Sequence, residues 1–186
     1  MNNTKYLIDT NIFVRFQSGQ QYDQSCFPVH FENFIKLLED GNAISIDKVK
    51  NELNDDFFCK EYEDIFKESI TNEIATTYNL LKSKQPEYFN TYEIENPNDA
   101  DPYLITYAYH HDLCIVTQDE FQSTSNRNLS IRKFNIPTIC EELGAICIDN
   151  KDKKENINQY ENGFGCICFT ELIRKEKLWK NNNHQK

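Results

Sequence analysis

Leu113-Cys114-Ile115-Val116-Thr117 is the clearest buried strand in the sequence, and Asp119 follows shortly after it. An uncharged run that is rich in β-branched side chains is typical of a parallel strand covered on both faces. The run Lys5-Tyr6-Leu7-Ile8 has the same apolar character and leads directly into Asp9. Both runs therefore predict strands that present an aspartate at their carboxyl ends.

Helical patterns separate these strands from two further short apolar runs. Residues 43–46 and 145–148 are expected to be strands, with the latter closing the sheet. Residues 85–98 contain two prolines and are expected to form a loop or a short helix. Helices are expected near 11–16 and over 28–40, 47–53, 57–70, 74–84, 101–111, 136–143 and 169–179. This alternation predicts an α/β fold with a mainly parallel central sheet and helices on both faces.

The length of 186 residues suits one domain, expected over 1–180. The Asn-rich, charged stretch 150–167 is expected to be an insertion loop, and 121–129 a polar mobile loop. Residues 181–186 are expected to be a disordered tail. No long apolar run and no secretory signal are visible, so we expect a cytoplasmic protein without membrane contact.

The seven cysteines lack the close spacing that zinc sites show, since no CxxC pair occurs. They are interpreted as buried thiols in a reducing compartment. The formal net charge of −10 argues against a protein that coats nucleic acid indiscriminately. It does not exclude a metal-dependent nuclease, because bound cations cancel the charge of clustered carboxylates.

Four acidic residues, here called the acidic set, are the candidates for chemistry: Asp9, Glu52, Asp101 and Asp119. Ligands of parallel sheets bind beyond the carboxyl ends of the strands, where two of the four are expected. Carboxylate oxygens suit Mg²⁺ or Mn²⁺, which can activate water and neutralise a phosphodiester.

Each member of the acidic set also has a purely structural interpretation. Asp9 could form a turn or cap a helix, and Glu52 could face solvent on its helix. Asp119 could be a turn residue, in competition with Glu120. Asp101 could be the N-cap of a helix that starts at Pro102.

Four segments resemble the acidic motifs of PIN domains: Tyr6–Phe13, Ile46–Leu53, Asp99–Ile105 and Val116–Asp119. The segment Lys133–Cys140 is similar to one in a poorly characterised bacterial PIN-like family. The resemblance extends over about residues 5–148 and resumes around 169–178. It implies a PIN-like three-layer sandwich and a nuclease that depends on Mg²⁺ or Mn²⁺.

The resemblance also implies roles and partners. It makes the acidic set the catalytic and metal-binding residues, with Asn11 and Thr117 as supporting groups around them. Many PIN domains are ribonuclease toxins of the VapC type, which implies an endoribonuclease acting on RNA. An antitoxin protein and a second copy of the chain are then the candidate partners.

Two other functions remain open from the sequence. The chain could be a catalytically inactive PIN-like binding module, or a structure-selective DNA nuclease. Asp99 and Asp101 compete for the third position of the acidic set. Pro102 favours Asp101 as both N-cap and metal ligand, with Asp99 as an outer-sphere or solvent-facing residue.

Overall fold

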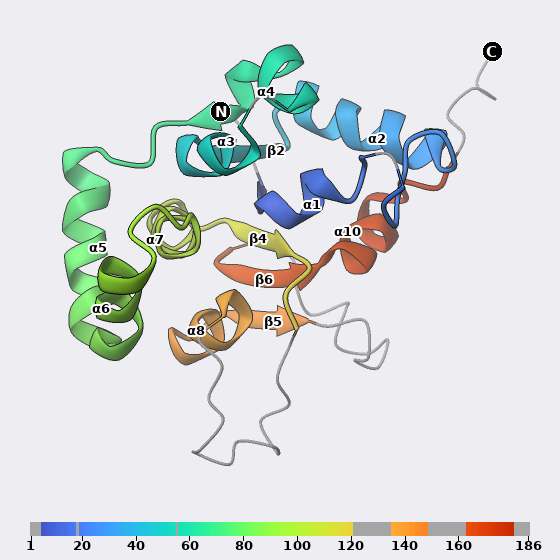
Figure 1. Cartoon of the computed structure of the whole chain (residues 1–186). Helices are drawn as coiled ribbons and strands as arrows, with labels where there is room; N and C mark the ends of the chain where they lie inside the picture. Colours follow the sequence, from blue (N-terminus) through green and yellow to red (C-terminus); the bar gives the residue numbers. More distant parts are fainter. Residues whose placement is uncertain (1–4, 18, 55, 121–134, 149–162, 181–186) are drawn as a thin grey trace.

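The computed structural model describes residues 5–17, 19–54, 56–120, 135–148 and 163–180 (Figure 1). Its strands form one sheet in the order β3-β2-β1-β4-β6-β5, and every pairing between the described strands is parallel. The strands are β1 (Tyr6–Ile8), β2 (Ala43–Ile46), β3 (Phe66–Lys67), β4 (Cys114–Thr117), β5 (Ile146–Ile148) and β6 (Gly165–Cys168). The predicted parallel α/β fold is confirmed.

The central strands are covered on both faces. Every residue of β1, β4 and β6 is buried, which requires side-chain packing above and below the sheet. Figure 1 shows α7 and α8 on one side of the strands and α2 and α10 on the other. The result is the three-layer sandwich that the resemblance to PIN domains implied.

Most helices agree with the sequence pattern, and the segment after Pro86 is a helix rather than a loop. In none of the described segments is a helix both long enough and apolar enough to cross a membrane. The helices are α1 (Thr10–Val14), α2 (Pro28–Glu39), α3 (Asp47–Leu53), α4 (Phe57–Glu61), η1 (Glu63–Ile65), α5 (Asn72–Lys84), α6 (Pro86–Glu95), α7 (Asp101–His111), α8 (Ile136–Glu142) and α10 (Phe169–Glu176).

The single amphipathic helix expected over 57–70 is wrong. This segment breaks into α4, the 3-10 helix η1 and the strand β3. The sheet offers an alternative to the helix, because Phe66 pairs with Ser45 at the edge of β2. The Phe66 ring also packs against Phe13, with ring centroids 5.8 Å apart. Long-range pairing thus overrides the local helical pattern.

The expected insertion loop over 150–167 extends too far, because its last residues belong to a strand. The expectation that 145–148 closes the sheet is also wrong. Residues 165–168 form β6, which inserts between β4 and β5. The chain therefore first forms β5 at the outer edge of the sheet, and then returns to form β6 inside it. The expected loop over 121–129, the remainder of the insertion over 150–162 and the tail 181–186 lie outside the described residues.

Candidate functional site

The sheet reverses its order of winding between β1 and β4. From β1 the chain moves outward through β2 and β3, and then returns to place β4 on the other side of β1. Ligands of doubly wound sheets bind at the carboxyl ends of the strands at such a reversal. Asp9 follows β1 and Asp119 follows β4, so both carboxylates stand at this position.

Thr117 joins the two strand ends. Its hydroxyl donates to Oδ2 of Asp9 at 2.7 Å, and it accepts from the backbone N–H of Asp119 at 3.0 Å. Asn11 completes the network: its Nδ2 donates to the Thr117 hydroxyl at 3.1 Å and to Oδ1 of Asp119 at 3.3 Å. The Asn11 carbonyl oxygen accepts from the backbone N–H of Gln118. Thr117 therefore contacts both aspartates, and Asn11 contacts Thr117 and Asp119.

Asp9 is a buried carboxylate among other carboxylates. Only 4% of its surface is exposed. Burial raises the pKa of Asp9 to about 7, because an ionised carboxylate loses hydration there; the Thr117 hydrogen bond opposes this rise, and the charge of Asp119 adds to it. A cation in the same place would stabilise the ionised form.

Glu52 reaches the same place from α3 and ties three elements together. Its Oε1 accepts from the backbone N–H of Ala100 at 2.7 Å, just before α7. Its Oε2 accepts from the hydroxyl of Thr10 in the first turn of α1. Glu52 is exposed, as its solvent-facing interpretation expected, but two donors orient its carboxylate toward α1 and the start of α7.

Asp47 stands at the beginning of α3. The N-cap of this helix is Ile46, and Asp47 is its first helical residue. The Asp47 carboxylate instead accepts from the backbone and hydroxyl of Ser69, beyond β3. The side chain fixes the edge of the sheet rather than the helix end.

The roles of Asp99 and Asp101 at the start of α7 differ from the predicted ones. Asp101 is not the N-cap of α7, because the helix begins at Asp101 and Ala100 precedes it in helical conformation. Asp99 takes the side-chain role instead: its Oδ1 accepts from the backbone N–H of Asp101 at 3.0 Å. Oδ2 of Asp101 accepts from the Tyr92 hydroxyl at 3.1 Å. Burial, followed by the charges of Asp9 and Asp99, raises the pKa of Asp101 well above its usual range.

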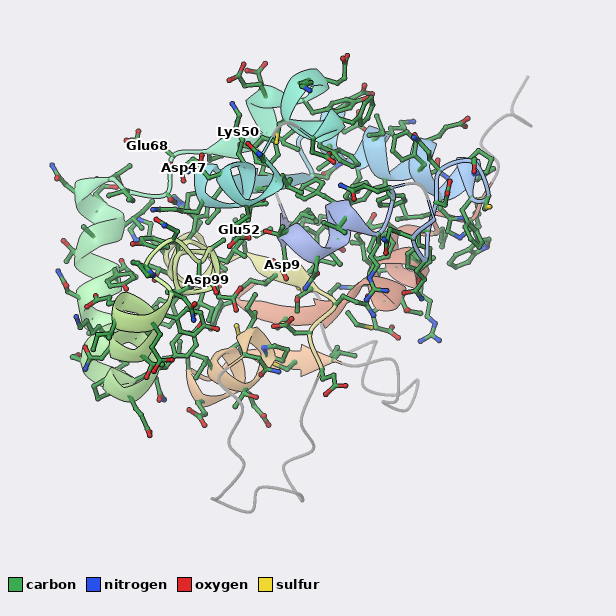
Figure 2. The ribbon with its side chains drawn as sticks, viewed as in Figure 1. Asp9, Asp47, Lys50, Glu52, Glu68 and Asp99 are labelled. Carbon is green, nitrogen blue, oxygen red and sulfur yellow. The ribbon has the colours of Figure 1, made fainter. Side chains whose placement is uncertain are left out.

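One cavity of about 550 Å³ brings these carboxylates together, and we call it the acidic cavity. In Figure 2, Asp9, Glu52 and Asp99 lie near one another, whereas Asp47 and Glu68 lie apart from them. Val14, Arg15 and Gln20 also line the cavity and are not among the predicted residues, although Arg15 is one helical turn beyond Asn11 and so shares its face. The lining residues are Asp9, Thr10, Asn11, Val14, Arg15, Gln20, Glu52, Asp99, Asp101 and Asp119.

The donor set of the acidic cavity fits a hard divalent cation. All its charged ligands are carboxylates, which suit Mg²⁺ or Mn²⁺ better than softer metals. Within the described parts of the chain, no three acidic, histidine or cysteine side chains are already close enough to hold an ion together. Like charges repel, so ion binding is expected to draw these carboxylates inward.

The family model of a domain of unknown function, DUF4411, matches residues 6–156. The chain belongs to this family. The match begins in β1 and contains every residue that lines the acidic cavity, while β6 and α10 lie beyond it. No curated protein and no solved structure matches the chain.

Proposed function

We propose that this DUF4411 protein is a PIN-type endoribonuclease that depends on Mg²⁺ or Mn²⁺. One observation carries the proposal: the four carboxylates of the acidic set come from separate elements and line one cavity at the switch point of a parallel sheet. A single loop rarely supplies enough ligands to surround a catalytic ion, so convergence from several elements is typical of such sites.

The acidic set would hold the ion, and the hydrogen-bond network would hold the acidic set. Thr117 and Asn11 fix the direction of the carboxylates of Asp9 and Asp119. The Ala100 N–H and the Thr10 hydroxyl do the same for Glu52. When bound, Mg²⁺ or Mn²⁺ supplies charge neutralisation at the phosphodiester and a water of lowered pKa.

The direct test is cleavage of labelled RNA in Mg²⁺ or Mn²⁺, with chelator as the blank. Asp9→Asn removes one charge and almost no volume, so it should abolish cleavage while the protein stays folded. Without divalent ions its melting temperature should equal or exceed that of wild type, because repulsion inside the cavity decreases. The matched control is Asp40→Asn, which changes an exposed carboxylate that does not line the cavity.

Two outcomes would contradict the proposal. Full cleavage by a folded Asp9→Asn protein would show that the acidic cavity is not the catalytic site. Cleavage of DNA but not RNA would contradict the proposed substrate and agree with the proposed metal site, because both polymers present the same phosphodiester to the ion. The toxin role has its own test: induced expression in a bacterial host should arrest growth for wild type and not for Asp9→Asn.

A further inference from the structure

Arg15 brings a positive charge to a cavity that is otherwise acidic. Of the described residues that line the acidic cavity, Arg15 alone has a cationic side chain. None of the described carboxylates forms an ion pair with it, and its guanidinium instead donates from Nη1 to Oε1 of Gln21 at 3.0 Å. A guanidinium carries five N–H donors, so most of its hydrogen-bonding capacity remains for another acceptor.

The direction of the Arg15 side chain follows from its place at the end of α1. Side chains on a helix lean toward its amino-terminal end, so Arg15 leans back over the turn that contains Asn11. Asp9 is six positions before Arg15, which corresponds to a rise of about 9 Å along the helix axis. Because the arginine side chain is long and leans back, its guanidinium can be closer to Asp9 than the two backbones are. Arg15 therefore lines the acidic cavity at a position displaced along α1 from Asp9.

Hydrogen bonds hold the described residues that follow Arg15, which are 16–17 and 19–25. The backbone N–H of Tyr22 donates to the Arg15 carbonyl at 2.9 Å, which brings Gln21 next to the arginine. The carboxylate of Asp23 accepts from the backbone N–H groups of Gly19 and Ser25 at 2.6 and 2.8 Å. Gln17 donates to Asp56 beyond α3 at 2.6 Å. These hydrogen bonds hold Gln17 and residues 19–25 around Arg15.

We infer that Arg15, oriented by Gln21, binds a backbone phosphate that neighbours the phosphodiester cut at the acidic set. This inference rests on the proposed nuclease function and adds a substrate contact to it. A polyanion must enter a cavity of carboxylates in a protein whose net charge is −10. A bound cation offsets the carboxylates at the reacting phosphate, and the planar fork of an arginine suits the next one along the strand.

The test measures binding of a fluorescent single-stranded RNA as a function of salt, in an Asp9→Asn background that does not cleave it. Each phosphate contact contributes about 0.7 to the slope of log K against log salt for a single strand. Arg15→Met keeps the alkyl stem and removes the charge, so it should lower the slope by about 0.7 and weaken binding on the order of tenfold. The control Lys36→Met removes an exposed charge on α2 outside the cavity and should leave the slope unchanged.

Two further variants separate binding from folding. Arg15→Lys should keep the slope and lose part of the affinity, because a lysine lacks the bidentate fork. Gln21→Ala keeps the charge but frees the guanidinium, so with an intact acidic set it should raise KM more than it lowers kcat. An unchanged slope and affinity for folded Arg15→Met, beside a wild type that cleaves RNA, would overturn this inference alone. A wild type that neither binds nor cleaves nucleic acid would overturn the proposed function as well.

Discussion

The hydroxyl of Thr117 and the carboxylate of Asp9 are joined by a 2.7 Å hydrogen bond between the ends of two adjacent parallel strands. Thr117 is fully buried, and Asp9 nearly so. The same hydroxyl accepts from Asn11 and from the backbone of Asp119. One oxygen atom therefore sets the relative positions of two candidate metal ligands.

Removing this oxygen should damage activity more than folding. Thr117→Val has nearly the same shape but leaves two donors and one carboxylate without their partner. We expect a loss of about 1–3 kcal/mol in the free energy of unfolding. We also expect a 10- to 100-fold fall in cleavage rate, the range typical of residues that orient metal ligands. Thr117→Ser keeps the hydroxyl and is the control; equal activity of the valine and serine variants would show that the bond has no role in chemistry.

Divalent ions should stabilise the folded protein through the acidic cavity. An ion that binds only the native state stabilises it by about 2.7 kcal/mol at a hundredfold excess over Kd. For a chain of this size, that corresponds to a rise in melting temperature of about 5–10 °C. Differential scanning fluorimetry with Mn²⁺, Mg²⁺ and chelator measures it. The double variant Asp9→Asn, Asp119→Asn should lose most of the rise; if it keeps the full rise, the ion binds elsewhere on this acidic protein.

Changing Asp99 and changing Asp101 to asparagine should have different effects on cleavage. Asp101→Asn removes a charge from the cavity and should abolish cleavage with little effect on stability. Asp99→Asn should change little, because an amide oxygen can still accept from the backbone N–H of Asp101. Asp99→Ala, which cannot accept, should cost about 1 kcal/mol of unfolding free energy. An inactive but folded Asp99→Asn protein would transfer the third ligand role to Asp99.

Cys166 should matter for stability and not for chemistry. It is fully buried in β6 and pairs in register with Ile115 and Cys147 on the flanking strands. Burial is the main cause that raises the pKa of the Cys166 thiol well above its usual range, so the thiol stays protonated. Cys166→Ser should lower the free energy of unfolding by about 1–3 kcal/mol and leave the cleavage rate of the folded protein unchanged. The exposed Cys26 provides the control, since Cys26→Ser should alter neither quantity.

Local pattern was sufficient for the parts of this fold that depend on short-range order. The apolar runs that became β1 and β4 are followed directly by polar residues, so the strands and the aspartates after them could be placed from the sequence. Helices with a regular apolar stripe, such as α2 and α7, were predicted for the same reason. The parallel sheet then placed Asp9 and Asp119 at one edge.

Long-range pairing decided what the local pattern could not. Residues 165–168 became an internal strand only because β4 and β5 both offered a partner edge to β6. The segment around Phe66 left its helical pattern for the edge of β2, where Phe13 also contacts it. In both cases the stabilising contacts are with residues far away in the sequence, which a local period does not record.

The candidate site also has features that depend on local sequence and features that depend on tertiary contacts. The sequence by itself determined which carboxylates stand at the ends of elements, because residue order and strand ends are local properties. Only the tertiary structure decided that Asp99 orients Asp101, that Glu52 bridges α1 and the start of α7, and that Arg15 faces the acidic cavity. These are relations between side chains and backbone groups of separate elements, and they exist only once the sheet has brought those elements together.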